Sequence, residues 1–251
     1  MLVVYFLLLC IALLIFYMLK QANEHHIVQH TAVIKGKRDF FRVLFISDVH
    51  NRYIQSEGLN KLGALDAVII GGDLCDRRTK REKLEKNLML LNQFGPIFFV
   101  WGNNDREFGE VELRQIFNEL KVTVVENDAV SLNNRQNTTW ISAIDDTSTK
   151  NYDFNKALSK CKINDVVLCV SHNPQVFQKA RRIRVPSMFL GGHLHGGQIR
   201  LGKYGLHPHG SFSVRNGVPT LISNGYGTTL VPLRLGAKPQ IHVIDIKVRN
   251  E

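Results

Sequence analysis

Cysteine is scarce in this sequence, with only four residues among 251, at Cys10, Cys75, Cys161 and Cys169. None of them belongs to a close-spaced C-x-x-C pair, which excludes a zinc ribbon and argues against a disulfide framework. The pattern predicts mostly buried free thiols in a reducing compartment. Internal repeats and low-complexity segments are also lacking. The length supports one large domain or two small ones, with ample room for a buried core.

Acidic residues are outnumbered, with 22 Asp and Glu against 32 Lys and Arg and a formal net charge of +10. Such an excess either attracts anions, such as phosphate substrates or acidic lipid, or serves solubility. One basic run, Arg181, Arg182 and Arg184, lacks interleaved aromatic residues, so no specific nucleic-acid partner is expected. The other, at 77–86, is interpreted either as a collar for an anionic substrate or lipid headgroups, or as a solvated helix face.

The N-terminal run from Leu2 to Leu19 contains no charged residue. Eighteen residues at the helical rise span roughly 27 Å, just enough to cross a hydrocarbon core of about 30 Å. Tyr5 and Tyr17 stand near the two ends of the run, as interfacial anchors do. Residues 1–20 are therefore predicted to form an N-terminal transmembrane helix that makes the chain a single-pass protein of the cell membrane.

A cleaved signal peptide is the alternative interpretation of this run. The run lacks a basic n-region, and residues 18–22 lack a small-x-small cleavage pattern, so an uncleaved anchor is favoured. No basic residue precedes the run, which by the positive-inside rule predicts a cytoplasmic location for the globular part. The basic residues that follow it are Lys20, Lys35, Lys37, Arg38 and Arg42.

Residues 21–39 are polar and contain His25, His26 and His30, and they are interpreted as a solvated linker rather than a metal site. From residue 40 to residue 251, apolar runs alternate with helical patterns and predict a globular domain. Its first half contains predicted strands at 42–47, 66–70 and 96–101, and predicted helices at 58–65, 80–94 and 110–120. This alternation argues for a parallel sheet with right-handed crossovers.

The pattern changes after Lys121. Short strands are predicted at 122–126, 129–132 and 139–143, joined by polar turns as in an antiparallel segment. A helix at 154–160, a strand at 166–170, a helix beginning at Pro174 and a strand at 187–190 follow. The tail is again β, at 219–223 and 240–248. This order fits an α/β fold with two packed sheets and outer helices.

Metal-type side chains follow five of the apolar runs. In α/β folds, sites form at the carboxyl ends of strands, where loops converge. One such residue is usually a turn residue or a surface polar group, but seven Asp, Asn and His residues at five strand ends predict a shared site. The clusters are Asp48-Val49-His50, Gly72-Asp73, Gly102-Asn103-Asn104-Asp105, Ser171-His172 and Gly192-His193-Leu194-His195.

Two of the clusters contain a pair of ligands two residues apart, namely Asp48 with His50 and His193 with His195. Alternate side chains at a strand end point the same way, so we expect each pair to reach one metal ion. Asp73 adds a carboxylate that can bridge two metals.

Asn103 supplies a neutral oxygen ligand and His172 a nitrogen ligand. Mixed Asp, His and Asn ligands suit Mn, Fe, Zn or Co better than Ca or Mg. Two such cations about 3.5–4 Å apart can clamp a phosphate and lower the pKa of a bridging water. The resulting hydroxide is expected to attack phosphorus in line with the leaving group.

The motif order is similar to that of the calcineurin-like metallophosphoesterase superfamily, which reads D-x-H, G-D, G-N-H-[DE], H and G-H-x-H. All five blocks stand in this order over residues 42–198. The block from Gly191 to Gln198 and the tail 221–236 resemble a bacterial branch of membrane-associated or exported phosphodiesterases, including relatives that hydrolyse UDP-diacylglucosamine. The resemblance covers nearly all of the chain after the anchor. It implies a fold of two mixed β-sheets packed as a sandwich and flanked by α-helices.

The resemblance also implies two divalent metal ions as cofactors and a role for each candidate ligand. The first metal would be held by Asp48, His50 and His195, the second by Asn103, His172 and His193, and both by a bridging Asp73. Asp105 completes the third block, where its expected role is to hold the loop or orient a ligand.

The third block departs from the family pattern at Asn104, because the family usually carries a His there that protonates the leaving oxygen. An Asn can donate a hydrogen bond but delivers no proton at pH 7, and losing a general acid costs about 10²–10⁴-fold on poor leaving groups. Asn104 and Asp105 remain the candidate catalytic residues. We expect either a substrate with a low-pKa leaving group or a proton from elsewhere, with His207 and His209 as candidates beside a surface or structural role.

Together these patterns predict a metal-dependent phosphoesterase acting on a phosphodiester or pyrophosphate bond. The anchor and positive charge favour a phosphorylated small molecule or a lipid-linked or nucleotide-sugar substrate at the membrane. A non-catalytic metal-binding scaffold is an alternative, because some relatives without the general-acid His serve in protein assembly. Such scaffolds tend to lose ligands too, whereas all seven stand here. A nuclease is a further possibility.

Overall fold

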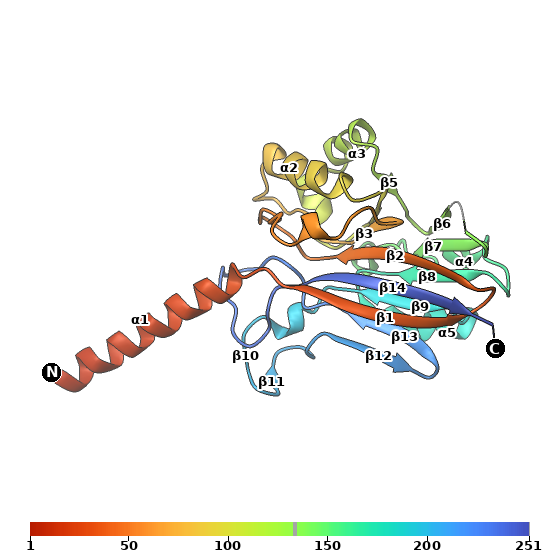
Figure 1. Ribbon diagram of the computed structural model, residues 1–251. Coiled ribbons are helices and arrows are strands. Elements are labelled where there is room, and N and C mark those ends of the chain that lie inside the picture. The colour runs from red at the N-terminus through yellow and green to blue at the C-terminus, as the bar shows by residue number, and fades with distance from the viewer. Residues whose placement is uncertain (133–134, 251) are drawn as a thin grey trace.

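Two six-stranded mixed β-sheets form the body of the protein, and Figure 1 shows the computed structural model, which describes residues 1–132 and 135–250. The first sheet has the order β1 (Ile27–Lys35), β14 (Ile241–Arg249), β2 (Asp39–Ile46), β3 (Ala67–Gly71), β4 (Ile97–Val100) and β5 (Thr123–Val124). The second has the order β12 (Ser211–Arg215), β13 (Val218–Ile222), β9 (Met188–Gly191), β8 (Val166–Val170), β7 (Thr139–Ala143) and β6 (Asp128–Leu132).

Helices cover the outer faces of the sandwich (Figure 1). The first sheet carries α2 (Arg81–Asn92) and α3 (Glu110–Glu119), and the second carries α4 (Phe154–Leu158) and α5 (Phe177–Ile183). A small hairpin of β10 (Arg200–Leu201) and β11 (Tyr204–Gly205) lies apart from both sheets. The prediction of two mixed sheets in a sandwich with flanking helices is confirmed.

Strand β2 shows why the central strands are apolar throughout. Its odd-numbered residues Phe41, Val43 and Phe45 pack in the core between the two sheets, where they meet side chains of β8 and β9. Its even-numbered residues Leu44 and Ile46 belong to a second core on the other face. A strand buried on both faces has no polar side to show, so period-two alternation disappears from the sequence.

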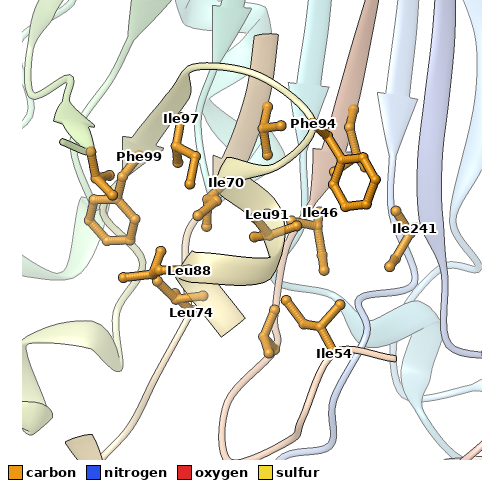
Figure 2. Close-up of a cluster of buried hydrophobic side chains, with 14 of the residues drawn as sticks. Ile46, Ile54, Ile70, Leu74, Leu88, Leu91, Phe94, Ile97, Phe99 and Ile241 are labelled. Atoms are coloured by element: carbon orange, nitrogen blue, oxygen red, sulfur yellow. The ribbon is translucent and has the colours of Figure 1, made fainter. Parts of the chain in front are cut away.

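The second core lies under α2, and Figure 2 shows Leu88 and Leu91 of this helix pointing onto the sheet residues Ile46, Ile70 and Ile97. All five of these side chains are at most 1% exposed. Burying one aliphatic side chain of this size contributes about 1.5–3 kcal/mol, which holds the strand ends of the first sheet firmly in place.

Helix α1 (Leu2–Ala22) extends away from the domain, and its side chains are exposed except for Met18, Gln21 and Ala22 at its end. It is the only helix among the described residues that is long and apolar enough to cross a membrane. The helical nature of the N-terminal run is therefore confirmed.

The prediction of a solvated linker over residues 21–39 is wrong for most of that segment. The helix continues to Ala22, and β1 pairs in parallel with β14 from Ile27 to Lys35. Ala32 and Ile34 are buried in the core between the sheets. The alternation in β1 is weak, and its pairing partner lies at the other end of the chain, so no local pattern announces the strand.

Two further predictions differ from the structure. The segment 58–65 forms only a 3₁₀ turn at Leu59–Lys61, because Gly58 and Gly63 have φ values of 76° and 69° that an α-helix cannot contain. The predicted strand 122–126 is the short β5, which pairs in parallel with β4 in the first sheet instead of starting an antiparallel segment. Strands β10, β11 and β12 were not predicted from the sequence.

Candidate metal centre

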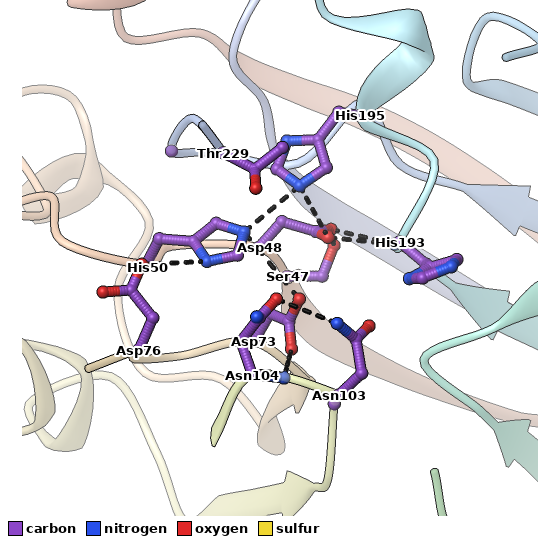
Figure 3. A network of polar contacts seen from close by, with 12 residues as sticks. Ser47, Asp48, His50, Asp73, Asp76, Asn103, Asn104, His193, His195 and Thr229 are labelled. Atoms are coloured by element: carbon purple, nitrogen blue, oxygen red, sulfur yellow. Dashed lines mark hydrogen bonds and ion pairs between the residues drawn. The ribbon is translucent and has the colours of Figure 1, made fainter. Parts of the chain in front are cut away.

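Five loops that leave the carboxyl ends of β2, β3, β4, β8 and β9 bring all seven predicted ligands to one end of the sandwich. Because these strands belong to both sheets, the cluster lies where the two sheets meet. Figure 3 shows Asp48, His50, Asp73 and His195 directed toward one another, with His193 and Asn103 at the margin.

The first group of donors consists of Asp48, His50 and His195, which are all buried. The His195 Nε2 atom lies 3.3 Å from Asp48 Oδ1 and 3.2 Å from His50 Nε2. Two ligands of one octahedral or tetrahedral ion at 2.0–2.1 Å stand roughly 2.8–3.4 Å apart, so this spacing suits a shared cation. The donors fit the ion that the resemblance implies.

The second group surrounds His172. Its Nε2 atom lies 3.2 Å from Asp73 Oδ2 and 3.2 Å from His193 Nδ1. Asn103 joins this side with a buried Oδ1 atom that has no hydrogen-bond partner, while its Nδ2 donates to Asn104 Oδ1. A buried acceptor without a partner is costly unless a cation or another donor occupies the space before it.

Two carboxylates link the groups. Asp73 Oδ2 lies 3.2 Å from His172 Nε2 and 3.8 Å from His50 Nε2, so it touches one histidine of each group. Asp48 Oδ1 lies 3.3 Å from His195 Nε2 and 3.9 Å from His172 Nε2. The geometry therefore gives Asp48, as well as Asp73, a place between the two groups.

The backbone at these residues adopts an unusual conformation. Asp48, His50, Asp73, His193 and His195 have φ values between 48° and 69°, in the left-handed region that non-glycine residues rarely occupy. Such strain persists where the surroundings over-determine it, and it clusters at functional sites. We expected Asp48 and His50, and likewise His193 and His195, to align because alternate side chains of a strand point the same way. This expectation is wrong, because β2 ends at Ile46 and β9 ends at Gly191, before these residues.

Close packing at two glycines explains how the loops approach one another. A Cβ atom on Gly192 would stand 2.4 Å from Ser47 Oγ and 2.5 Å from Asp48 Oδ2, and one on Gly102 would stand 2.3 Å from the backbone nitrogen of Asp73. Any larger residue at either position would push a ligand out of the cluster.

Several residues that sequence reasoning missed orient the ligands. Ser47 Oγ donates to Asp48 Oδ2 over 2.6 Å, and the carbonyl of Gly71 accepts from His172 Nδ1 over 2.9 Å, which leaves Nε2 facing the cluster. Asp76 Oδ2 lies 3.4 Å from the outer nitrogen of His50. Outer partners of this kind fix the tautomer and direction of a metal-binding imidazole.

Asp105 is fully buried and ties the metal-side loops together. Its carboxylate accepts from the backbone N–H groups of Gly102, Asp73 and Cys75 over 2.7, 2.8 and 3.1 Å. Burial, and next the charge of Asp73, raise the pKa of Asp105 to about 7. The neighbouring Asn104 uses its backbone N–H to donate to Asp73 Oδ1 and its side chain to donate to Glu107.

The charges inside the cluster shift the pKa values of its histidines in opposite directions. Burial by itself lowers the pKa of His172, but the carboxylates of Asp73 and Asp48 outweigh it and raise this pKa to about 10. Burial, and then the neighbouring His50 and Arg234, hold the pKa of His195 well below its usual value. The carboxylates thus favour positive charge at this point, which a metal ion supplies when it displaces the proton.

Arg234 lies in the tail 221–236 that carries the resemblance, but the sequence does not indicate that it is a buried cation beside the donor cluster. It is 0% exposed and donates to the backbone carbonyl oxygens of Asn224, Gly227 and Ala237, and it reaches the carbonyl of His195 at 3.4 Å. Burial lowers the pKa of Arg234 to about 9, which leaves it charged at neutral pH. It holds the loop after β13 against the loop that carries His195.

The remaining candidates lie outside the cluster. His209 contacts Asn224 and the carbonyl of Gly210, and His207 is exposed, and among the described residues neither contacts a predicted ligand. Arg78 pairs with Asp76 over 2.6 Å, so this member of the basic run reaches the cluster indirectly through the partner of His50. Cys75 is buried, and burial together with Asp105 raises its pKa well above the usual value.

The family comparison agrees with this arrangement. The family model for the calcineurin-like phosphoesterase domain matches residues 41–197, which contain all seven candidate ligands. The chain belongs to the calcineurin-like metallophosphoesterase family. It is therefore a hydrolase of phosphoester bonds, and the family's use of divalent metals agrees with the two donor groups.

Individual relatives cover most of the chain. It is similar to the uncharacterized protein YpbG of Bacillus subtilis, with 37% identity over 90% of this chain and 89% of that protein. It is also similar to the phosphodiesterase YaeI of Escherichia coli, with 26% identity over 86% of this chain and 85% of that protein.

A solved structure shares the fold. The 5'-nucleotidase precursor of Thermus thermophilus superposes with a TM-score of 0.51 and 12% identity, over 83% of this chain and 55% of that chain. This likeness concerns the fold alone, and the chain spans about half the length of that nucleotidase.

Proposed function

We propose that the chain is a membrane-anchored phosphodiesterase or pyrophosphatase that works with two divalent ions drawn from Mn, Fe, Zn and Co. The observation that carries the proposal is the pair of neighbouring donor groups, which the carboxylates of Asp48 and Asp73 connect. Asp48, His50 and His195 would hold one ion, Asn103, His172 and His193 would hold the other, and Asp73 would contribute its carboxylate to both.

When bound, two such ions neutralise phosphoryl oxygens and activate a water as the nucleophile. The residues of this chain decide where that chemistry takes place. Ser47 and the backbone N–H of His193 hold the Asp48 carboxylate, and Asp105 holds the loops of Asp73 and Asn103 together. Asp105 acts as a positioning residue in this proposal, since its oxygens are already occupied by backbone N–H groups.

Asn104 shapes the choice of substrate. Its amide can donate a hydrogen bond to a substrate oxygen, but it delivers no proton to a leaving group at neutral pH. A phosphoanhydride, as in a nucleotide-sugar pyrophosphate, leaves without that proton far more readily than an alkoxide does. We therefore favour a substrate with a low-pKa leaving group, carried on a nucleotide sugar, on another phosphorylated small molecule or on a lipid.

Helix α1 is proposed to anchor the enzyme as a single span with the catalytic domain in the cytoplasm. Its length, apolar surface and exposure support the span, and the basic residues that follow it support the orientation. In this division residues 1–20 form the anchor, and 40–251, together with the strand β1, form the catalytic domain.

The decisive experiment measures hydrolysis of bis-p-nitrophenyl phosphate by the full chain in detergent with Mn(II), followed by cyclic nucleotides and nucleotide-sugar pyrophosphates. Asp73→Ala is expected to lower kcat/KM by at least about 100-fold and to weaken Mn(II) binding measured by calorimetry, because it removes the carboxylate between the groups. Asp153→Ala is the matched control, since Asp153 only caps α4.

Different outcomes separate the alternatives. Absence of Mn(II)-dependent hydrolysis on every substrate, with Asp73→Ala unchanged in all assays, would support a non-catalytic scaffold. Cleavage of DNA or RNA that falls steeply with added salt would identify a nuclease.

A further inference from the structure

An apolar surface lies at the end of the domain where α1 joins it. The surface comes from the β10–β11 hairpin and from the loop after Thr229, and its side chains are far more exposed than core residues of the same type. Its members and their exposed fractions are Leu201 at 72%, Tyr204 at 71%, Leu206 at 90%, Leu230 at 90% and Val231 at 43%. We call these five residues the hairpin surface.

The segment 234–236, which follows Val231 in the chain, contacts the end of α1 directly. The backbone N–H of Arg234 donates to the carbonyl of Met18 over 3.2 Å, and that of Gly236 donates to Gln21 Oε1 over 2.7 Å. The same segment forms bridges from Leu235 and Gly236 to Ile199, directly before β10. Figure 1 shows β10 and β11 at the end of the domain from which α1 departs.

The metal centre lies at this same end. Gln198, three residues after His195, donates from Nε2 to the carbonyls of Thr229 and Val231 and accepts from the Thr229 N–H through Oε1. Figure 3 shows Thr229 beside His195. The loop that exposes Leu230 therefore runs along the margin of the donor cluster.

The segment after α1 reaches the other side of the cluster. Arg52, two residues after His50, donates to the carbonyls of Asn23 and Glu24, and His25 contacts the Tyr226 hydroxyl over 2.9 Å. Eight hydrogen bonds thus connect the end of α1, the loop after Thr229 and the loops that carry His50 and His195. If α1 spans a bilayer, the bilayer surface faces this end.

The charge around the hairpin surface suits anionic lipid. No Asp or Glu occurs between Asp165 and Asp245, a stretch that contains the whole surface. Lys20, Lys203 and Lys238 are exposed at this end, and Lys203 Nζ lies 5.3 Å from the centre of the Tyr204 ring. Lysine and tyrosine side by side are typical of protein segments in the headgroup region.

We propose that the hairpin surface inserts into the headgroup region of the bilayer, so that the metal centre opens toward the membrane and acts on phosphoesters carried by lipids. The inference rests on the proposed anchor and on the proposed phosphoesterase activity. It adds a second point of membrane contact, beside α1, and it names the bilayer surface as the partner of this face.

The test uses the full chain in vesicles that contain an anionic phospholipid, with acyl chains either brominated or not. Bromine quenches Trp only at close range, so one added Trp reports the depth of its position by the extra quenching over that of the parent. Leu206→Trp and Leu230→Trp are expected to lose emission in brominated vesicles relative to the parent, which carries only Trp101 and Trp140. Ile163→Trp is the matched control, because Ile163 is 92% exposed and precedes β8 at the opposite end of the sheets.

Phe6→Trp, within α1, reports whether the anchor itself enters the bilayer. Quenching of Phe6→Trp without any at positions 206 and 230 overturns the inference and leaves the anchor intact. Absence of quenching at positions 6, 206 and 230 overturns both the inference and the proposed membrane anchor. Quenching at positions 206 and 230 above that of Ile163→Trp supports the inference even if no substrate is turned over, because this readout needs no activity.

A second readout concerns the substrate. The double variant Leu206→Glu, Leu230→Glu is expected to lower hydrolysis of a vesicle-embedded lipid phosphodiester and to leave hydrolysis of soluble bis-p-nitrophenyl phosphate unchanged. An equal loss on both substrates would contradict the role of the surface in presenting lipid. If the parent enzyme hydrolyses neither substrate, the result would instead count against the proposed function.

Discussion

Asn104 is the residue at which this site departs from the family's usual third block. Its side chain donates to Glu107 and accepts from Asn103, while its backbone N–H holds Asp73. The backbone contact does not depend on the side chain, so position 104 can change its acid–base chemistry without losing the hydrogen bond to Asp73. This separation makes the residue a clean place to test the leaving-group argument.

The substitution Asn104→His is expected to raise kcat on an alkyl phosphodiester by about tenfold or more, because an imidazolium can protonate an alkoxide as it leaves. Turnover of an aryl diester should change little, since its leaving group needs no proton. The measurement is steady-state hydrolysis of both substrates with Mn(II). Equal rates for the variant and the parent on the alkyl diester would refute the leaving-group argument.

His242 and His30 form a buried pair away from the metal centre. His30 Nε2 lies 3.0 Å from His242 Nδ1, and His242 Nε2 lies 2.9 Å from Ser223 Oγ. Burial, and then the proximity of His30, lower the pKa of His242 to about 3, and burial also lowers that of His30. Both imidazoles are therefore neutral in the folded protein, where one donates to the other.

This pair predicts acid sensitivity. A lowered pKa in the folded state stabilises the protein fully above pH 6.5 and progressively less as pH falls toward 3, because only the unfolded chain binds the proton. As the pH falls from 7 to 5, His242 alone lowers the free energy of unfolding by about 2 kcal/mol. Thermal unfolding of His242→Gln should depend less on pH than that of the parent. The exposed His207→Gln should keep the parental slope, and equal slopes for all three would contradict the assignment.

At the scale of elements, β1 is the strand that local pattern did not reveal. Its residues alternate between the core and solvent only in the second half, where Ala32 and Ile34 are buried and Val33 and Lys35 are exposed. Its partner β14 lies at the other end of the chain. The strand follows α1 directly and pairs with β14, so α1 is joined to the first sheet through a ladder of hydrogen bonds.

Two neighbouring positions in β1 test this assignment. Ile34→Ala should destabilise the protein by about 2–4 kcal/mol, because it empties space in the core between the sheets. Val33→Ala should cost less than about 1 kcal/mol, because Val33 is 52% exposed. Denaturant unfolding in detergent measures both. A similar, small effect of the two substitutions would mean that the segment behaves as a linker after all.

At the scale of the whole molecule, the carboxyl ends of five strands, the end of α1 and the hairpin surface all lie at one end of the sandwich. The C-terminal strand β14 runs the other way from β2, so the chain ends at the far side, away from the metal centre. A fusion at the C-terminus therefore avoids the metal centre and the end of the domain from which α1 departs.

This placement allows a direct test of orientation. A reporter active only in the cytoplasm, fused after Glu251, is expected to be active, because basic residues follow α1 and favour the cytoplasmic side. A reporter active only outside the cytoplasm should stay silent in the same fusion. The opposite result would place the catalytic domain outside and contradict the charge-based orientation.

The order of strands and helices was largely predictable, because burial on both faces or on one leaves a local imprint in the sequence. Predicted strands at 42–47, 66–70, 96–101 and 166–170 correspond to β2, β3, β4 and β8. The exceptions are physical. Two glycines at positive φ stopped the helix expected at 58–65, and β1 and β5 owe their place to partners that no local pattern names.

The sequence by itself determined the candidate donors, the motif order, the family and the apolar N-terminal run, because residue type and spacing are written in the chain. Only the tertiary structure decided that Asp48 and Asp73 both stand between the donor groups, that five candidate ligands adopt left-handed backbone, and that Ser47 and Arg234 contact members of the cluster. It alone placed the hairpin surface beside the end of α1. The reason is that such distances arise from the packing of segments far apart in sequence, which periodicity does not encode.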